Sequence, residues 1–137
     1  MRIMAIDYGD RRIGLAVSDE TGSICGDAWT ISEWDFNNAA QRIAEEASGR
    51  GVVRFVLGLP KNMDGSLGPR AQKSAEFAGL LGSLSGLEVI LWDERLTTVD
   101  ASRILIENGR RGKKRKQKLD TVAAALILES YLDSLAK

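Results

Sequence analysis

The N-terminal part of the chain holds two short runs of aliphatic and β-branched residues with only three residues between them. The runs cover Arg2 to Tyr8 and Arg12 to Val17, and the intervening Gly9 to Arg11 is typical of a tight turn. Because two apolar runs joined so closely pair side by side, this pattern predicts a β-hairpin. A third strand over Gly26 to Ser32, after a turn at Asp19 to Ser23, extends the hairpin to an antiparallel meander.

After the meander, the pattern changes to alternating strands and helices. The expected helices cover Asn37 to Ala47, Arg70 to Leu84, Thr97 to Asn108 and Leu119 to Leu135, and the expected buried strands cover Val52 to Leu57 and Glu88 to Trp92. Buried strands with helices between them pair in parallel, with helices on both faces. The order predicts an α/β fold with a mixed five-stranded sheet, three antiparallel strands and then two parallel ones. The ribonuclease H-like fold and the actin and sugar-kinase ATPase fold both begin in this way.

The composition limits both the number of domains and the available chemistry. A length of 137 residues with 44% apolar side chains suits a single domain over residues 1–137. The chain has no histidine and one cysteine, Cys25, so neither a histidine-based triad nor an internal disulfide can form. Any hydrolysis must then depend on carboxylates, lysine or a bound metal. No apolar stretch approaches the roughly 18 residues of a membrane span, and Asp7 comes too early for a signal peptide, so we expect a cytoplasmic protein without a membrane partner.

Three acids stand where the expected fold would bring them together. Asp7 ends the first strand on an apolar face, where it is either a structural acceptor for amides or a metal ligand. Glu94 follows the strand Glu88 to Trp92 at the edge where α/β sheets bind ligands, although a solvated loop would look the same. Asp120 lies in the first turn of the last expected helix, where capping alone would explain an acid. Alternation places Asp93 on the opposite face from Glu94, so we do not expect both to bind the same ion, and we prefer Glu94 of the two.

Considered together, these acids indicate a metal site. Carboxylates from three separate elements suit a hard divalent cation such as magnesium. We predict that Asp7, Glu94 and Asp120 are catalytic and hold one or two Mg²⁺ or Mn²⁺ ions, with Asp93 as a further candidate ligand. Two such ions about 4 Å apart can orient the attacking water and stabilise the leaving oxygen of a phosphodiester. The expected activity is therefore that of a metal-dependent nuclease, a hydrolase acting on ester bonds.

The basic residues are concentrated in one segment, although the 19 basic and 19 acidic residues balance overall. The segment Arg110 to Lys118 lies directly before Asp120, and we interpret it as a mobile cationic loop that binds phosphates. The loop Gly58 to Ser66 precedes a helix started by Pro69, and its free amides would face a phosphate, although it lacks the lysine of a Walker A motif. We predict nucleic-acid contacts from Arg12, Asn62, Ser66, Arg95, Thr98, Arg110, Arg111, Lys113, Lys114, Arg115, Lys116 and Lys118.

Five short motifs in this order and spacing resemble the YqgF family of pre-16S ribosomal RNA nucleases, which are also described as Holliday-junction-resolvase-like. The motifs are Ile6-Asp7-Tyr8-Gly9, Arg12-Ile13-Gly14-Leu15-Ala16-Val17-Ser18-Asp19, Gly58-Leu59-Pro60 with Asp64-Gly65-Ser66, Asp93-Glu94-Arg95-Leu96-Thr97-Thr98, and Lys118-Leu119-Asp120 with Ala123-Ala124. The resemblance covers essentially the whole chain. It implies a ribonuclease H-like fold and a role in processing the 5′ end of precursor 16S rRNA, with ribosomal assembly intermediates as partners.

The resemblance also implies that Asp7, Glu94 and Asp120 are the catalytic acids. One departure concerns the last helix, where the related junction resolvases have a second aspartate and this chain has Ala123. Three alternatives remain at this point: a Holliday-junction-type DNA resolvase, a non-catalytic rRNA-binding assembly factor, and an ATP-binding domain of the actin and sugar-kinase type. We expect a monomer or a weak dimer.

Overall fold

The computed structural model describes residues 1–9, 11–96 and 113–136, apart from the side chains of residues 113–121. Its elements are β1 (Arg2–Asp7), β2 (Arg12–Ser18), β3 (Cys25–Ser32), α1 (Phe36–Arg50), β4 (Val52–Leu59), α2 (Pro69–Ser85), β5 (Glu88–Asp93), the 3₁₀ turn η1 (Glu94–Leu96) and α4 (Lys113–Ala136). The expected helix over Thr97 to Asn108, together with Thr98, Arg110 and Arg111, lies outside the described residues. None of the helices in the described part of the chain is both long and apolar enough to span a membrane.

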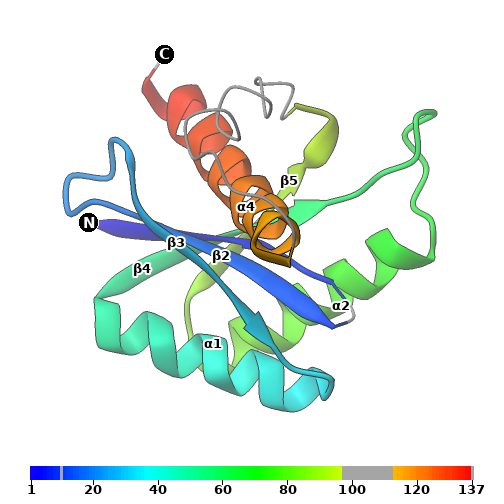
Figure 1. Ribbon diagram of the computed structural model, residues 1–137, viewed down its shortest axis with the longest axis horizontal. Helices are drawn as coiled ribbons and strands as arrows, with labels where there is room; N and C mark the ends of the chain where they lie inside the picture. The colour runs from blue at the N-terminus through cyan, green and yellow to red at the C-terminus, as the bar shows by residue number, and fades with distance from the viewer. Residues whose placement is uncertain (10, 97–112, 137) are drawn as a thin grey trace.

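The five strands form one mixed sheet in the order β3-β2-β1-β4-β5, which confirms the predicted architecture (Figure 1). The first three strands are antiparallel neighbours, while β1 pairs with β4 and β4 with β5 in parallel. As a result, the carboxyl ends of β1, β4 and β5 meet at one edge of the sheet. β2 runs opposite to β1, so it starts at that same edge. β3 runs opposite to β2, so it ends there.

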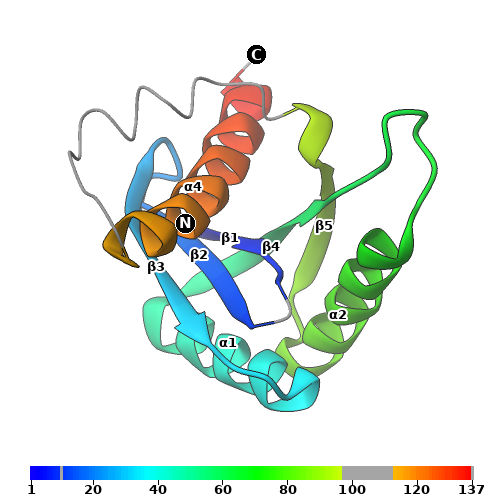
Figure 2. The same cartoon turned by 45° about the vertical axis from the view of Figure 1, so that its right-hand side comes forward.

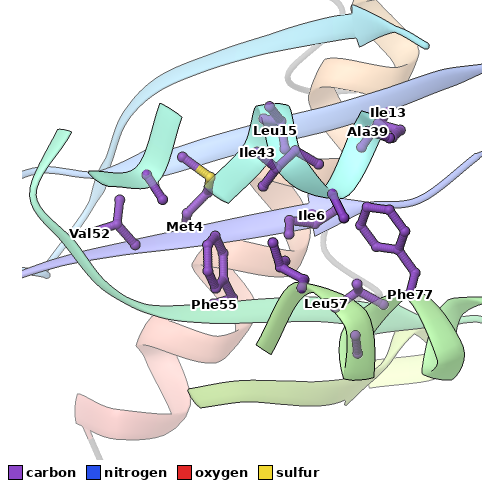
Figure 3. Packing of buried hydrophobic residues seen from close by; sticks show 14 of the residues in the cluster. Met4, Ile6, Ile13, Leu15, Ala39, Ile43, Val52, Phe55, Leu57 and Phe77 are labelled. Atoms are coloured by element: carbon purple, nitrogen blue, oxygen red, sulfur yellow. The ribbon is translucent and has the colours of Figure 1, made fainter. Parts of the chain in front are cut away.

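Side-chain alternation along the strands builds a separate apolar cluster on each face of the sheet. On one face, Met4 and Ile6 of β1 pack with Phe55 of β4 against α1 and α2 (Figure 3). On the other face, Ile3 and Ala5 of β1 pack against α4, which among the described helices is the one that crosses that face (Figures 1 and 2). Period-two alternation therefore assigns odd-numbered positions of β1 to the side of the sheet that α4 covers.

The ends of α1 and α2 follow local sequence signals. The Asp35 side chain caps α1, because its Oδ1 accepts a hydrogen bond from the amide of Asn38 at 2.8 Å. The helix ends at Gly51, whose φ of 71° is the left-handed conformation that glycine adopts without strain. Pro69 occupies the first turn of α2, as the sequence predicted.

The last helix begins earlier than expected, at Lys113 instead of Leu119. The prediction of a mobile cationic loop is therefore wrong for Lys113 to Lys118, which form the first turns of α4. Lysine, arginine and glutamine are good helix formers, and repulsion between like charges one turn apart costs only a few tenths of a kcal/mol per pair. Asp120 consequently lies about two turns inside α4 and not in its first turn, so helix capping no longer accounts for it.

Candidate active site

The candidate site lies where the carboxyl ends of the three parallel-running strands meet. Asp7 is the last residue of β1. Because Ile6 pairs with Leu57 of β4, the residue of β4 that follows at the level of Asp7 is Gly58. Gly58 in turn pairs with Trp92 of β5, two residues before Glu94. Asp7 and Glu94 therefore reach this edge from the strands on either side of Gly58.

At Gly58 the backbone of β4 lies close to the Glu94 side chain. A Cβ atom on Gly58 would lie 2.6 Å from Oε1 of Glu94 and 2.6 Å from Cδ1 of Ile127 in α4. Contacts below 3.0 Å force a shift, and Ile127 is only 1% exposed. The Glu94 carboxylate thus occupies space that only glycine leaves open, on the face of the sheet that α4 covers.

Asp93 has a different environment from Glu94, because an arginine binds its carboxylate. The Arg95 guanidinium donates to Asp93 Oδ2 at 2.7 Å and to Oδ1 at 3.1 Å, and the backbone amide of Arg95 donates to Oδ1 at 2.9 Å. These hydrogen bonds lower the pKa of Asp93 to about 2 and raise the pKa of Arg95. The Arg95 guanidinium also donates to the carbonyl oxygen of Met63 at 3.3 Å, which ties the end of β5 to the loop after β4.

We predict that this pairing keeps Asp93 ionised at pH values where ordinary aspartates are already protonated. Its folded-state pKa lies below the unfolded value, so the pair contributes stability above pH 4 and loses it as the pH falls through about 2. The carboxyl ¹³C chemical shift of Asp93, followed by NMR during acid titration, should have its midpoint near pH 2. In Arg95→Gln the midpoint should rise toward 4, and an unchanged midpoint in that variant would show that Arg95 is not the cause.

Several backbone amides of the loop between β4 and α2 donate hydrogen bonds within the loop itself. The amide of Lys61 donates to Leu59, that of Asn62 to the carbonyl of Ser66, and that of Gly65 to Asn62, each at 2.9 Å. The amide and hydroxyl of Ser66 both donate to Asp64 Oδ1, and these bonds lower the pKa of Asp64. The expectation that free amides of this loop face a phosphate is therefore wrong for these amides, because turn formation already uses them. The side chains of Asn62 and Ser66 bond to each other at 3.0 Å.

The third predicted acid, Asp120, belongs to α4, but its side chain lies outside the described part of the structure. Four residues later on the same helix, Ala124 is fully buried against the sheet, as is Ile127 beside Gly58. Within the described residues, which leave out the Asp120 side chain, no three carboxylate or thiol groups cluster closely enough to hold a metal ion. The structure thus brings Asp7 and Glu94 to the same edge and separates Asp93 from Glu94 through Arg95.

Sequence reasoning named Gly58 and Arg95 but missed the roles that the structure gives them at this edge. Gly58 lies inside a strand of mostly apolar residues, and an isolated glycine inside a strand often marks a close approach of another group. Arg95 follows Asp93 at a spacing that allows the two side chains to pair locally. Both signals were present in the sequence, but neither identifies the partner without the fold.

The sheet order and its helices define a protein of the ribonuclease H-like class. Consistent with this, the fold matches that of Thermus thermophilus RuvC in complex with a Holliday junction substrate, with a TM-score of 0.63, 13% identity, and coverage of 98% of this chain and 96% of that chain. The sequence itself matches the family described as "RuvX: Holliday junction resolvase" over residues 1–134, so the chain belongs to the RuvX (YqgF) family.

Relatives with high sequence identity share one description. A protein of Acetivibrio thermocellus described as "Putative pre-16S rRNA nuclease" is 46% identical, covering 100% of this chain and 99% of the relative. A protein of Geobacillus sp. with the same description is 47% identical, covering 98% of this chain and 99% of the relative. The family resemblance drawn from the motifs is thereby confirmed.

Proposed function

We propose that the chain is a divalent-metal-dependent nuclease that hydrolyses phosphodiester bonds at the 5′ end of precursor 16S rRNA, acting in the cytoplasm on ribosomal assembly intermediates. Membership of a family of nucleases and resolvases supports hydrolysis of nucleic acid. The descriptions of the relatives support ribosomal RNA as the substrate. The choice of Asp7 and Glu94 and of a divalent metal rests on the geometry of the sheet edge, and Asp120 is retained from the sequence motif.

The observation that carries the proposal is the arrangement of Asp7, Gly58 and Glu94. The Glu94 carboxylate lies over a glycine that has no side chain, and Asp7 ends the strand on the other side of that glycine. Glu94 brings carboxylate oxygens to this point, and such oxygens are the ligands that Mg²⁺ and Mn²⁺ prefer. In the proposed site, Asp7 and Glu94 from the sheet and Asp120 from α4 would supply the oxygen donors for a hard divalent ion.

In this proposal each residue has a limited task. Asp7 is held at the end of a buried strand, and the Glu94 carboxylate is held close to the backbone of Gly58, so both acids would be positioned before substrate arrives. A divalent ion bound there would supply Lewis-acid chemistry, polarising the phosphate and favouring deprotonation of the attacking water. Asp93 has no role as a ligand, because it holds Arg95 and, through Arg95, the loop at Met63.

Basic side chains around this edge would bind the substrate backbone. The first turns of α4 carry Lys113, Lys114, Arg115, Lys116 and Lys118, which lie ahead of Asp120 on the same helix. Phosphate contacts there would guide the backbone toward the acids without reading its sequence. Arg12, at the start of β2, is exposed at the same edge. Thr98, Arg110 and Arg111 stay in the proposal as predicted contacts, as do Asn62, Ser66 and Arg95.

A second candidate substrate, the four-way DNA junction, is favoured by the description of the family as Holliday junction resolvases. Ala123 occupies the place where the related junction resolvases have a second aspartate on the last helix, and it is partly buried. A site with fewer carboxylates binds a second metal ion less tightly. We therefore rank precursor RNA above junction DNA.

The proposal is tested by incubating the protein with a precursor 16S rRNA fragment and, separately, with a synthetic four-way DNA junction. We expect Mg²⁺-dependent shortening of the 5′ end of the RNA, no cleavage after chelation with EDTA, and recovery when Mn²⁺ is added. If only the junction is cleaved, the substrate is the DNA junction and not precursor rRNA. If neither nucleic acid is cleaved with either metal, the proposed activity is wrong.

A further inference from the structure

Trp34 is the one tryptophan of the chain whose ring stands open to solvent. It is 74% exposed, and the Arg11 guanidinium lies 4.9 Å from its ring centroid. By contrast, Trp29 packs against the core, and Trp92 donates its Nε1 hydrogen to Ser130 at 3.1 Å. Packing within the fold therefore explains why the other two positions carry tryptophan, but it does not explain the tryptophan at position 34.

The Arg11 and Trp34 pair lies at the same sheet edge as the candidate active site. Arg12 pairs with Ser32 in the β2–β3 register, and the amide of Glu33 donates to the carbonyl of Arg11 at 3.3 Å. In the order β3-β2-β1, only β2 separates β3 from the strand that ends at Asp7, so β3 and β1 are about 10 Å apart. Asp7 pairs with Gly14 and Gly14 with Thr30, so Trp34 also lies four residues further along the chain than the position level with Asp7. A nucleic-acid strand bound at Asp7 would reach Trp34 within several nucleotides.

The surface between the hairpin tip and α2 is hollowed. A hollow of about 310 Å³ is lined by Tyr8 and Gly9, which follow Asp7 in the chain, and by Pro69, Arg70 and Lys73 of α2. A neighbouring hollow of about 410 Å³ shares Pro69 and Lys73 with it and is also lined by Gln72, Glu76 and Phe36, the last of which comes two residues after Trp34. Arg70 and Lys73 are cations of the kind that bind phosphates, while Glu76 makes the second hollow mixed in charge.

We propose that Trp34, held by Arg11, is a stacking platform for an unpaired base of the nucleic-acid substrate. The inference rests on the proposed nuclease function, since it assigns the substrate an unpaired segment next to the cleaved bond. A guanidinium over one face of the indole fixes the ring and leaves the rest of its surface for a base. Every base has a π face, so the platform selects unpaired strands over duplex without reading sequence.

The test compares binding of three probes in an Asp7→Asn background, where the probes remain uncleaved: an oligouridylate, an oligothymidylate of the same length and a blunt RNA duplex. Trp34→Ala should weaken binding of the single strands roughly tenfold, as expected for the loss of one stacked base, and leave duplex binding unchanged. Trp34→Phe should retain most of the affinity, because it keeps an aromatic ring. If Trp34→Ala weakens binding of the oligouridylate alone, the platform binds RNA specifically. If it weakens binding of both single strands, the platform binds any unpaired strand.

A matched control is Leu84→Ala, which removes an exposed apolar side chain near the other end of α2 and should change none of the three affinities. Equal affinities of the Trp34→Ala variant and its parent for both single strands would overturn the inference, as would an equal loss on the duplex. This failure is distinguishable from failure of the proposed function. If the parent chain cleaves RNA with Mg²⁺ and Trp34→Ala binds normally, only the platform is wrong, whereas a parent chain that cleaves nothing removes the nuclease proposal itself.

Discussion

Replacing Asp7 by asparagine is expected to abolish metal-dependent cleavage of precursor 16S rRNA while leaving the fold and RNA binding intact. The amide has nearly the shape of the carboxylate but lacks its charge, so the strand end keeps its packing while the ion loses a ligand. Deleting one preorganised group that stabilises charge in a transition state costs about 10²–10³-fold in rate, and we expect at least that loss here. Single-turnover cleavage measured in Mg²⁺, alongside circular dichroism and RNA binding, would check it.

The matched control for this variant is Asp27→Asn. Asp27 lies on β3 opposite Val17, toward the far end of the sheet from Asp7, and it is 59% exposed with Arg50 at 3.4 Å. The same chemical change there should leave the cleavage rate unaltered, since an exposed ion pair contributes at most about 1 kcal/mol to stability. If Asp7→Asn cleaves as fast as its parent, Asp7 does not hold the metal and the proposed mechanism is wrong.

The strands were predictable from the sequence because the apolar runs that favour strands locally are also the segments that the fold buries. Each expected strand appears within two residues of its observed bounds, since apolar runs flanked by turns have little alternative in a chain of this size. Parallel pairing of β4 with β1 and β5 also followed, because the intervening helices force a crossover. Period-two alternation correctly separated Asp93 from Glu94, and the structure adds that Arg95 binds Asp93.

The start of α4 and the details of the edge were not predictable in the same way. A run of lysines and arginines suits a solvated loop and a helix equally well, and helix propensity decides between them only when the preceding chain allows a helix to begin. The loop amides depend on which turns form between Leu59 and Ser66, and several turn types fit that composition. Trp34 gave no signal in the sequence, because exposure is a property of the folded surface.

The second large effect is expected from Gly58→Ala, a change of one methyl group. Its Cβ would lie 2.6 Å from both Glu94 Oε1 and Ile127 Cδ1, and the buried Ile127 has little freedom to move. Overpacking of this kind costs about 1–3 kcal/mol of stability, measurable as a lower midpoint in urea unfolding. Displacement of the Glu94 carboxylate by about 1 Å would lower the cleavage rate about 10²-fold in the folded variant.

Gly79→Ala is the matched control, because it adds the same methyl group at a position where the group meets no other atom. A Cβ on Gly79 meets nothing within 4 Å, and the residue lies inside α2, where alanine is favoured over glycine by about 0.5–1 kcal/mol. Gly79→Ala should therefore be slightly more stable than its parent and equally active. A Gly58→Ala protein that is folded and fully active would show that the position of the Glu94 carboxylate does not matter for cleavage, and Glu94 would then have to be removed from the metal site.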